Sequence, residues 1–146
     1  MEIRKMTIDD YEKVYDLWMA CVGMGLNNLD DSPAGIEKFL WRNPDTCFVA
    51  EMKDAVVGVI MAGNDGRRGF IYHTAVHPEH RRKGIAERLV DRAMKELANL
   101  GIHKVALVVF EKNEGGNMFW ERQGFTVRKD LVYRNKALSE LIRIDT

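Results

Sequence analysis

Residues 76–86 combine the residue types that a phosphate-binding site needs. A strand predicted over Gly69–Val76 is followed by the basic run Arg81-Arg82-Lys83, and Gly84 then opens a helix. The first turn of a helix has unpaired N–H groups and the positive end of the helix dipole. Gly84 permits close approach to the backbone, and Ala86 keeps the next turn small. The segment therefore indicates either a diphosphate site or a solvated basic turn before an ordinary helix.

Hydrophobic periodicity predicts the elements that position this segment. Apolar spacings of three and four indicate helices, and short apolar runs between turn residues indicate strands. The predicted order is β-α-α-β-β-β-α-β-α-β-β, a mixed sheet of the α/β class. The predicted strands are residues 2–6, 47–51, 55–62, 69–76, 105–110, 125–127 and 131–133. The predicted helices span residues 7–23, 32–43, 84–99 and 113–123.

Two of these strands carry more specific predictions. Residues 105–110 are almost continuously apolar, which predicts a strand buried on both faces and, after one crossover helix, parallel to Gly69–Val76. Side chains of a regular strand alternate between its faces. Alternation places Tyr72 and His73 on opposite faces, so His73 is expected to be a packed histidine.

Composition limits the function classes. The 146 residues carry 22 basic and 22 acidic side chains, and a neutral chain is unsuited to nucleic acid or an anionic membrane. No repeat or linker divides the chain, so we expect one domain over residues 1–146. No apolar run could span a bilayer or act as a signal peptide, and Cys21 and Cys47 are expected to be reduced, so a cytoplasmic location is expected. The histidine spacing fits no common zinc pattern, so no metal is expected.

The motif Arg81-x-x-Gly84-x-Ala86 resembles the acetyl-CoA signature of the GNAT N-acetyltransferase superfamily, which reads Gln or Arg, two residues, Gly, one residue, then Gly or Ala. A second block, from Asn113 through Phe119-Trp120-Glu121-Arg122-Gln123-Gly124-Phe125, resembles the superfamily's "Asn…Phe-Tyr-Glu-x-x-Gly-Phe" helix and turn. The resemblance covers essentially the whole chain. It implies the GNAT fold, with a V-shaped splay between the fourth and fifth strands.

The resemblance also implies a set of acetyl-CoA contacts. Acetyl-CoA would lie in the splay, and its pyrophosphate would be held at the motif. The motif contacts would come from Arg81, Arg82, Lys83, Gly84, Ile85 and Ala86. Backbone groups of Ala75, Val76 and His77 would pair with the pantetheine arm, and the Val76 N–H would face the thioester carbonyl. Asn113 and Phe119 match positions along the same arm, but a helix N-cap and a core aromatic explain these two residues equally.

Proton transfer is the part of the mechanism that the sequence leaves open. The acceptor amine must lose a proton, and the departing thiolate benefits from a donor. The superfamily's tyrosine acid is replaced by Trp120, so either water or another group, Tyr133 or Tyr72, would supply the proton. No carboxylate or imidazole occupies the positions on Gly69–Val76 where relatives carry a base. Tyr72 could line the acceptor pocket, and Glu111 is either a base or an exposed carboxylate.

The acceptor side is expected to include residues 23–31 and the second helix. Asp30 and Asp31 could attract a cationic amine or simply belong to a solvated loop, and Trp41 is either a pocket wall or core. The resemblance thus implies acetyl transfer from acetyl-CoA to a primary amine in a ternary complex. The alternative is a CoA-binding regulatory or partner module that has lost catalysis. Superfamily members often form homodimers, and the late strands could do so here.

Overall fold

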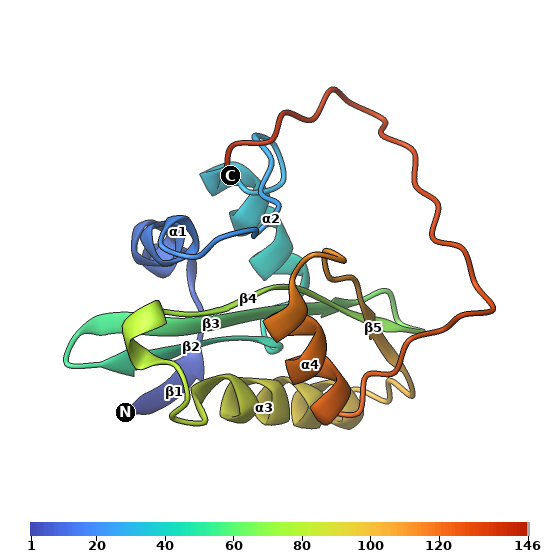
Figure 1. Ribbon diagram of the computed structural model, residues 1–146. Coiled ribbons are helices and arrows are strands. Elements are labelled where there is room, and N and C mark those ends of the chain that lie inside the picture. Colours follow the sequence, from blue (N-terminus) through green and yellow to red (C-terminus); the bar gives the residue numbers. More distant parts are fainter. Residues whose placement is uncertain (146) are drawn as a thin grey trace.

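The predicted apolar runs form a five-stranded sheet with helices on both faces (Figure 1). The computed structural model describes residues 1–145. The strands are β1 (Glu2–Lys5), β2 (Cys47–Met52), β3 (Ala55–Asn64), β4 (Gly69–Val76) and β5 (Val105–Leu107). They lie in the order β1-β2-β3-β4-β5, and all neighbours are antiparallel except β4 and β5, which are parallel as predicted. The expected mixed α/β class is confirmed.

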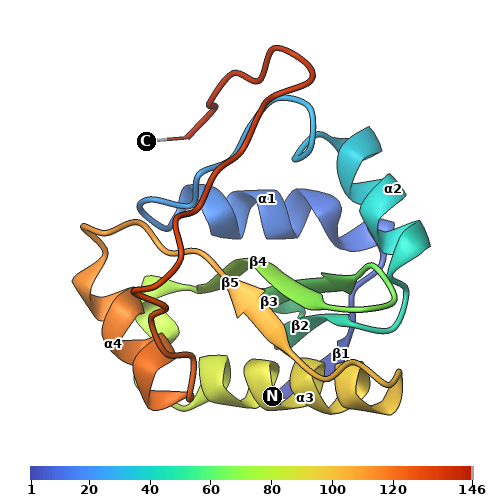
Figure 2. The same cartoon turned by 90° about the vertical axis from the view of Figure 1, so that its right-hand side faces the viewer.

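Four α-helices cover the sheet. One face carries α1 (Tyr11–Met19) and α2 (Pro33–Arg42), and α3 (Ile85–Asn99) covers the other (Figure 2). The last helix, α4 (Glu114–Arg122), stands beside β5 and α3. Two short 3₁₀ turns, η1 (Ile8–Asp10) and η2 (Pro78–His80), precede α1 and α3. The predicted start of α2 is confirmed, because the Ser32 hydroxyl accepts the Gly35 N–H at 3.1 Å.

Two apolar layers hold the sheet between the helices. On the α1/α2 side the buried cluster includes Trp18, Leu26 and Val59. On the α3 side it includes Phe48, Ile60 and Leu89. The alternation of side chains along the strands therefore produces one apolar layer against α1 and α2 and another against α3. The cluster to which a buried residue belongs shows which face of the sheet it occupies.

A β-bulge in β4 overturns the predicted positions of Tyr72 and His73. Ile60 pairs with Thr74 but Ala62 pairs with Ile71, so Met61 alone stands opposite Tyr72 and His73. Two residues opposite one bring neighbouring side chains to the same side of the strand. The Tyr72 ring meets Phe39 of α2 at 5.5 Å between centroids, and the His73 ring meets Trp18 of α1 at 5.1 Å. Both side chains therefore face α1 and α2.

The expected splay between the fourth and fifth strands is present. Pairing between β4 and β5 is confined to residues 69–71 and 105–107, so the rest of β4 has no strand on that side within residues 1–145. The prediction of a doubly buried strand over residues 105–110 was wrong. The strand ends at Leu107, and Val108 and Phe110 are 59% and 48% exposed. Within residues 1–145 no strand pairs with the outer edge of β5, and the Arg143 guanidinium lies over the Phe110 ring at 5.0 Å.

The two predicted C-terminal strands, residues 125–127 and 131–133, are not formed. After α4 the chain continues as an extended segment that stands away from the body before returning to it (Figure 1). We call residues 126–141 the C-terminal arm. A single bridge between Asn27 and Arg143 is the only β-pairing recorded beyond α4 in the described residues. In residues 1–145 no helix is both long and apolar enough to cross a membrane.

Candidate active site

The loop between β4 and α3 presents a row of unsatisfied backbone N–H groups. Gly84 has a positive φ of 77° and is the N-cap of α3, and Arg82 also has a positive φ of 64°. In the described part of the chain, the amides of residues 82–86 have no hydrogen-bond acceptor, and the first helical bond of α3 is from Arg88 to Gly84. A Cβ at Gly84 would meet nothing within 4 Å, so the space beside Gly84 is open. Such a cradle suits an anion.

The end of β4 offers a further free amide beside this cradle. The His77 N–H donates to the Val57 carbonyl at 2.8 Å. Because the groups of an antiparallel strand alternate, those of Ala75 also face β3, and those of Val76 face the open side of the splay. Of the three backbone contacts expected here, only Val76 thus presents its N–H toward the splay. The His77 amide is already used, and its ring nitrogen accepts the Glu79 N–H at 3.2 Å.

The Arg81 side chain points back to the strand. Its Nε donates to the Val76 carbonyl at 3.1 Å, and its Nη2 lies 3.6 Å from the Cys21 sulfur. These contacts bind the β4–α3 loop to the end of β4 and to α1's C-terminal side. Arg82 and Lys83 are exposed, and Ile85 is buried against the sheet. Arg81 therefore positions the loop, while Arg82 and Lys83 supply positive charge at its mouth.

The residues of the second motif have structural roles. The Asn113 side chain caps α4 by accepting the Gly116 N–H at 2.9 Å. Phe119 packs edge-on against Trp120 at 5.0 Å, and Trp120 packs against Phe125 at 5.2 Å. This aromatic group joins α4 to the α3 side of the core. The indole of Trp120 therefore has a packing role at the position where the superfamily pattern has tyrosine.

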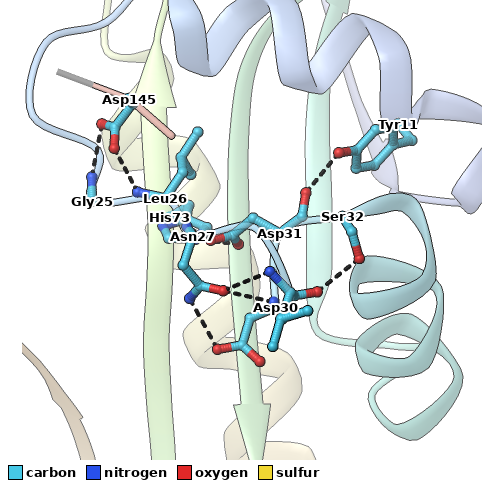
Figure 3. A network of polar contacts seen from close by, with 10 residues as sticks. Tyr11, Gly25, Leu26, Asn27, Asp30, Asp31, Ser32, His73 and Asp145 are labelled. Carbon is cyan, nitrogen blue, oxygen red and sulfur yellow. Dashed lines mark hydrogen bonds and ion pairs between the residues drawn. The ribbon is translucent and has the colours of Figure 1, made fainter. Parts of the chain in front are cut away.

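On the opposite face, the loop between α1 and α2 is fastened to β4 through Asp31 (Figure 3). Asp31 is only 3% exposed, and its Oδ1 lies 2.6 Å from His73 Nε2. Its Oδ2 accepts the Asn27 N–H at 2.8 Å, and its carbonyl accepts the Tyr11 hydroxyl at 2.6 Å. A buried carboxylate needs such partners to offset its lost hydration. Asp31 is thus a buried partner of the imidazole, and not part of a solvated loop.

The same loop is held from its other end by Asp145. The two carboxylate oxygens accept the N–H groups of Gly25 and Leu26 at 2.9 and 2.8 Å (Figure 3). Burial raises the pKa of Asp145, but the bonds from Arg143 and from these amides outweigh it and hold that pKa below its ordinary value. The α1–α2 loop is therefore clamped between the strand and the end of the chain.

Tyr72 lies next to His73 on this face and is half exposed. Burial raises its pKa above the ordinary value of 10, and the nearby Tyr133 and Asp30 raise it further. The phenol is therefore neutral at physiological pH, where it can donate a hydrogen bond but cannot serve as a ready base. Asp30 itself is exposed and accepts a bond from the Asn27 side chain at 3.0 Å.

The remaining sequence candidates lie at the surface. Glu111 is exposed beyond the end of β5, and Tyr133 is 67% exposed on the C-terminal arm, where no strand forms. Trp41 is 84% exposed, so it is not a core residue. Of the three proposed proton-transfer residues, Tyr72 is the one on β4, and Tyr133 comes near it from the C-terminal arm.

Sequence reasoning missed the Asp31–His73 pair. Regular alternation put His73 on the wrong face, and nothing in the local pattern marks a bulge. The position of Asp31 could have indicated the pair. Asp31 immediately precedes Ser32, the N-cap of α2, so it lies close to the sheet if α2 packs on the sheet. In the described residues, no group of three His, Cys, Asp or Glu side chains could hold a metal ion.

Comparison with known proteins assigns the sequence to a family. Residues 11–125 match the family model "Acetyltransferase (GNAT) family". An acetyltransferase of Sodalis glossinidius (strain morsitans) is 37% identical over 140 residues, which are 96% of this chain and 97% of that protein. An acetyltransferase of Pectobacterium atrosepticum is 41% identical over 140 residues, again 96% and 97%.

Solved structures show the same fold. Ard1 from Thermoplasma volcanium matches with a TM-score of 0.76 at 22% identity, covering 87% of this chain and 83% of that chain. At such identity the likeness concerns the fold alone. The family model and the relatives support a family assignment as well, because their sequences match most of this chain. The expected family is therefore confirmed: the chain belongs to the GNAT acetyltransferase family and is an acyltransferase.

Proposed function

We propose that the protein transfers the acetyl group of acetyl-CoA to a primary amine by direct attack in a ternary complex. The observation that carries the proposal is the row of unpaired amides at residues 82–86, beside the exposed charges of Arg82 and Lys83. A diphosphate would satisfy these donors at the positive end of α3. The chemistry fits coenzyme A, and PaiA N-acetyltransferase from Thermoplasma acidophilum, solved with coenzyme A, has this fold (TM-score 0.73, 21% identity, 87% and 90% coverage).

The residues at the end of β4 suit the acyl-transfer step. In the proposed complex the pantetheine arm lies along the open side of β4, and the Val76 N–H hydrogen-bonds the thioester carbonyl. This donor would then stabilise the negative charge that develops on that oxygen when the amine attacks. The Ala75 side chain is buried in the layer under α1 and α2. Asn113 and Phe119, at the start of and within α4, would border the pantetheine arm.

For the acceptor's proton, His73 is the group that the geometry favours. With its Nε2–H donated to Asp31, its Nδ1 keeps a lone pair. Val76 is three positions after His73 along the strand, a distance of roughly 10 Å, so the proton would pass through water. Tyr72 would orient the acceptor by donating a hydrogen bond. Glu111 and Tyr133 are the weaker candidates, since both are exposed.

The experiment is an assay of free CoA thiol with acetyl-CoA and a panel of amines: peptides with free N-termini, lysine peptides, polyamines, amino acids and aminoglycosides. We expect thiol release that depends on one class of amine, together with acetylated product by mass spectrometry. Tight binding of acetyl-CoA with no amine-dependent release would instead favour the CoA-binding module. No binding of acetyl-CoA by calorimetry would contradict both.

A further inference from the structure

The α1/α2 face of the sheet carries exposed apolar side chains where β4 meets β5, below α1 and beside α2 (Figure 2). Ile71 packs in the layer against α3, so its neighbour Phe70 faces the α1/α2 side. In β5 the two outer residues also pack against α3, and Ala106 between them is exposed and pairs with Phe70. We call this surface the β4–β5 floor; it consists of Phe70, Tyr72, Ala106 and Val108.

The floor is rich in aromatic rings and is bounded by α2. The rings of Phe70 and Tyr72 lie 4.8 Å apart between centroids, and Tyr72 meets Phe39 of α2 at 5.5 Å. Phe39 can approach the sheet because Gly63 of β3 has no side chain, since a Cβ there would come within 2.8 Å of the Phe39 ring. A row of rings therefore extends from α2 across β4, and burial of such rings contributes strongly to binding.

A surface hollow lies at the far end of this row, between the end of α2 and the turn from β3 to β4. Its volume is about 440 Å³, and its lining residues are Trp41, Arg42, Asn64, Asp65 and Gly66. The end of α2 is fixed to this turn, because the Asn43 side chain accepts the Asn64 N–H at 3.1 Å. Asn64 pairs with Gly69, the residue before Phe70, so the hollow adjoins the floor.

The two ends of this surface carry opposite charge. Around the hollow, Arg42, Arg67 and Arg68 are exposed, and none of the ion pairs in the described residues includes them. The acid of the turn, Asp65, is occupied by two backbone N–H groups at 2.8 Å. At the other end, the exposed Asp30 lies near Tyr72. A ligand that complements both ends has a positive group beside Tyr72 and a negative group at the hollow.

From these observations we propose that the acceptor is an acidic peptide, whose amino terminus lies beside Tyr72 and whose acidic side chains reach the hollow. The inference rests on the proposed function and specifies its acceptor class. Arg68 lies five positions before His73, roughly 15 Å along the strand, which is the length of about five extended residues. The middle of the peptide would cover the β4–β5 floor. Trp41, which is 84% exposed, and Arg42 are residue types that contribute strongly to binding at interfaces.

The first test measures binding without turnover, with the full chain saturated with coenzyme A. The probes are peptides without tryptophan that share a free amino terminus and apolar residues, followed by a run of glutamates, glutamines or lysines. Trp18 is fully buried, so covering Trp41 should move tryptophan emission to shorter wavelength, and Trp41→Phe should abolish this shift. We expect the glutamate peptide to bind at least about tenfold more tightly than the lysine peptide, with a preference that salt weakens.

Charge reversal at the hollow tests which residues set this preference. Arg42→Glu and Arg67→Glu should each bring the affinities of the glutamate and lysine peptides to within about twofold of each other, with an unchanged circular dichroism spectrum. The matched control is Lys95→Glu, which changes the net charge equally at an exposed position of α3, on the opposite face. This variant should retain the preference of the unmodified protein.

The second test offers the same peptides with acetyl-CoA, beside polyamines and aminoglycosides. We expect the glutamate peptide to be acetylated with the highest kcat/KM. Equal binding of the three peptides, a preference that survives both hollow variants, or better turnover of a polyamine or aminoglycoside would overturn the inference. The last result would still support acetyl transfer to an amine. If no amine of any class is acetylated, the proposed function is contradicted, and the acceptor role of the peptide with it.

Discussion

The chain segments on the two sides of the C-terminal half of β4 are built in different ways. The β4–α3 loop is one continuous stretch of chain, in which Gly84, the first turn of α3 and the basic residues are neighbours in sequence. The opposite face is assembled from the α1–α2 loop, the β4 bulge and the end of the chain, through Asp31, His73 and Asp145. The first side depends on local backbone geometry, and the second on contacts between distant segments. Changes to the two sides should therefore separate donor binding from acceptor chemistry.

The largest effect is expected from Gly84→Asp. The new side chain would add bulk and negative charge beside the free amides of residues 82–86. We expect the affinity for acetyl-CoA, measured by calorimetry, to fall at least about 100-fold, because losing two or more bonds to a diphosphate costs roughly 3 kcal/mol.

Gly66→Asp is the matched control for this change. Gly66 also has a positive φ, 89°, and open space around its Cβ, but it lies in the turn between β3 and β4. Both variants carry the backbone strain of a side chain at positive φ, about 1 kcal/mol. Equal losses of affinity in the two would show that strain alone is responsible, and would remove the cradle from donor binding.

The next effect is expected from His73→Ala, which removes a proposed base and also lowers stability, because the buried Asp31 loses its imidazole partner. Losing a general base lowers kcat by about 100-fold, while acetyl-CoA affinity should stay unchanged because the cradle is on the other side of β4. Added imidazoles should restore part of the rate, and the restored rate should rise with the basicity of the imidazole used, which a merely structural role would not cause. His103→Ala, at an exposed histidine before β5, is the control. A normal kcat in His73→Ala would exclude His73 as the base.

The smallest effect is expected from Tyr72→Phe. The phenol is neutral and contributes one hydrogen bond, so its loss should raise KM for the acceptor about threefold with little change in kcat. The ring contacts with Phe39 and Phe70 would persist in the variant. Unchanged KM and kcat would remove Tyr72 from the site, and a large fall in kcat would make it a proton-transfer group.

The same contrast explains what the sequence revealed. Helix starts at Ser32 and Gly84 were predictable, because a cap and the first turn it serves lie within a few residues. The splay was predictable from the family resemblance. The Asp31–His73 contact depends on a bulge set by the register of β3 against β4, which no local pattern encodes. Residues 125–127 and 131–133 have strand-like composition, but composition does not determine whether a segment lies beside a strand with which it can pair.

The bulge in β4 also bears on the surface proposed here for the acceptor. Ile71 and Thr74 flank the bulge and both face α3, as they would in a regular strand one residue shorter. The bulge therefore adds one side chain on the α1/α2 face and does not change which residues pack against α3. Loss of one residue at Tyr72–His73 would change the surface proposed for the acceptor and leave the hydrophobic layer on the α3 side in register. On the proposed function, substrate preference could therefore evolve at this position without a change in the protein's interior.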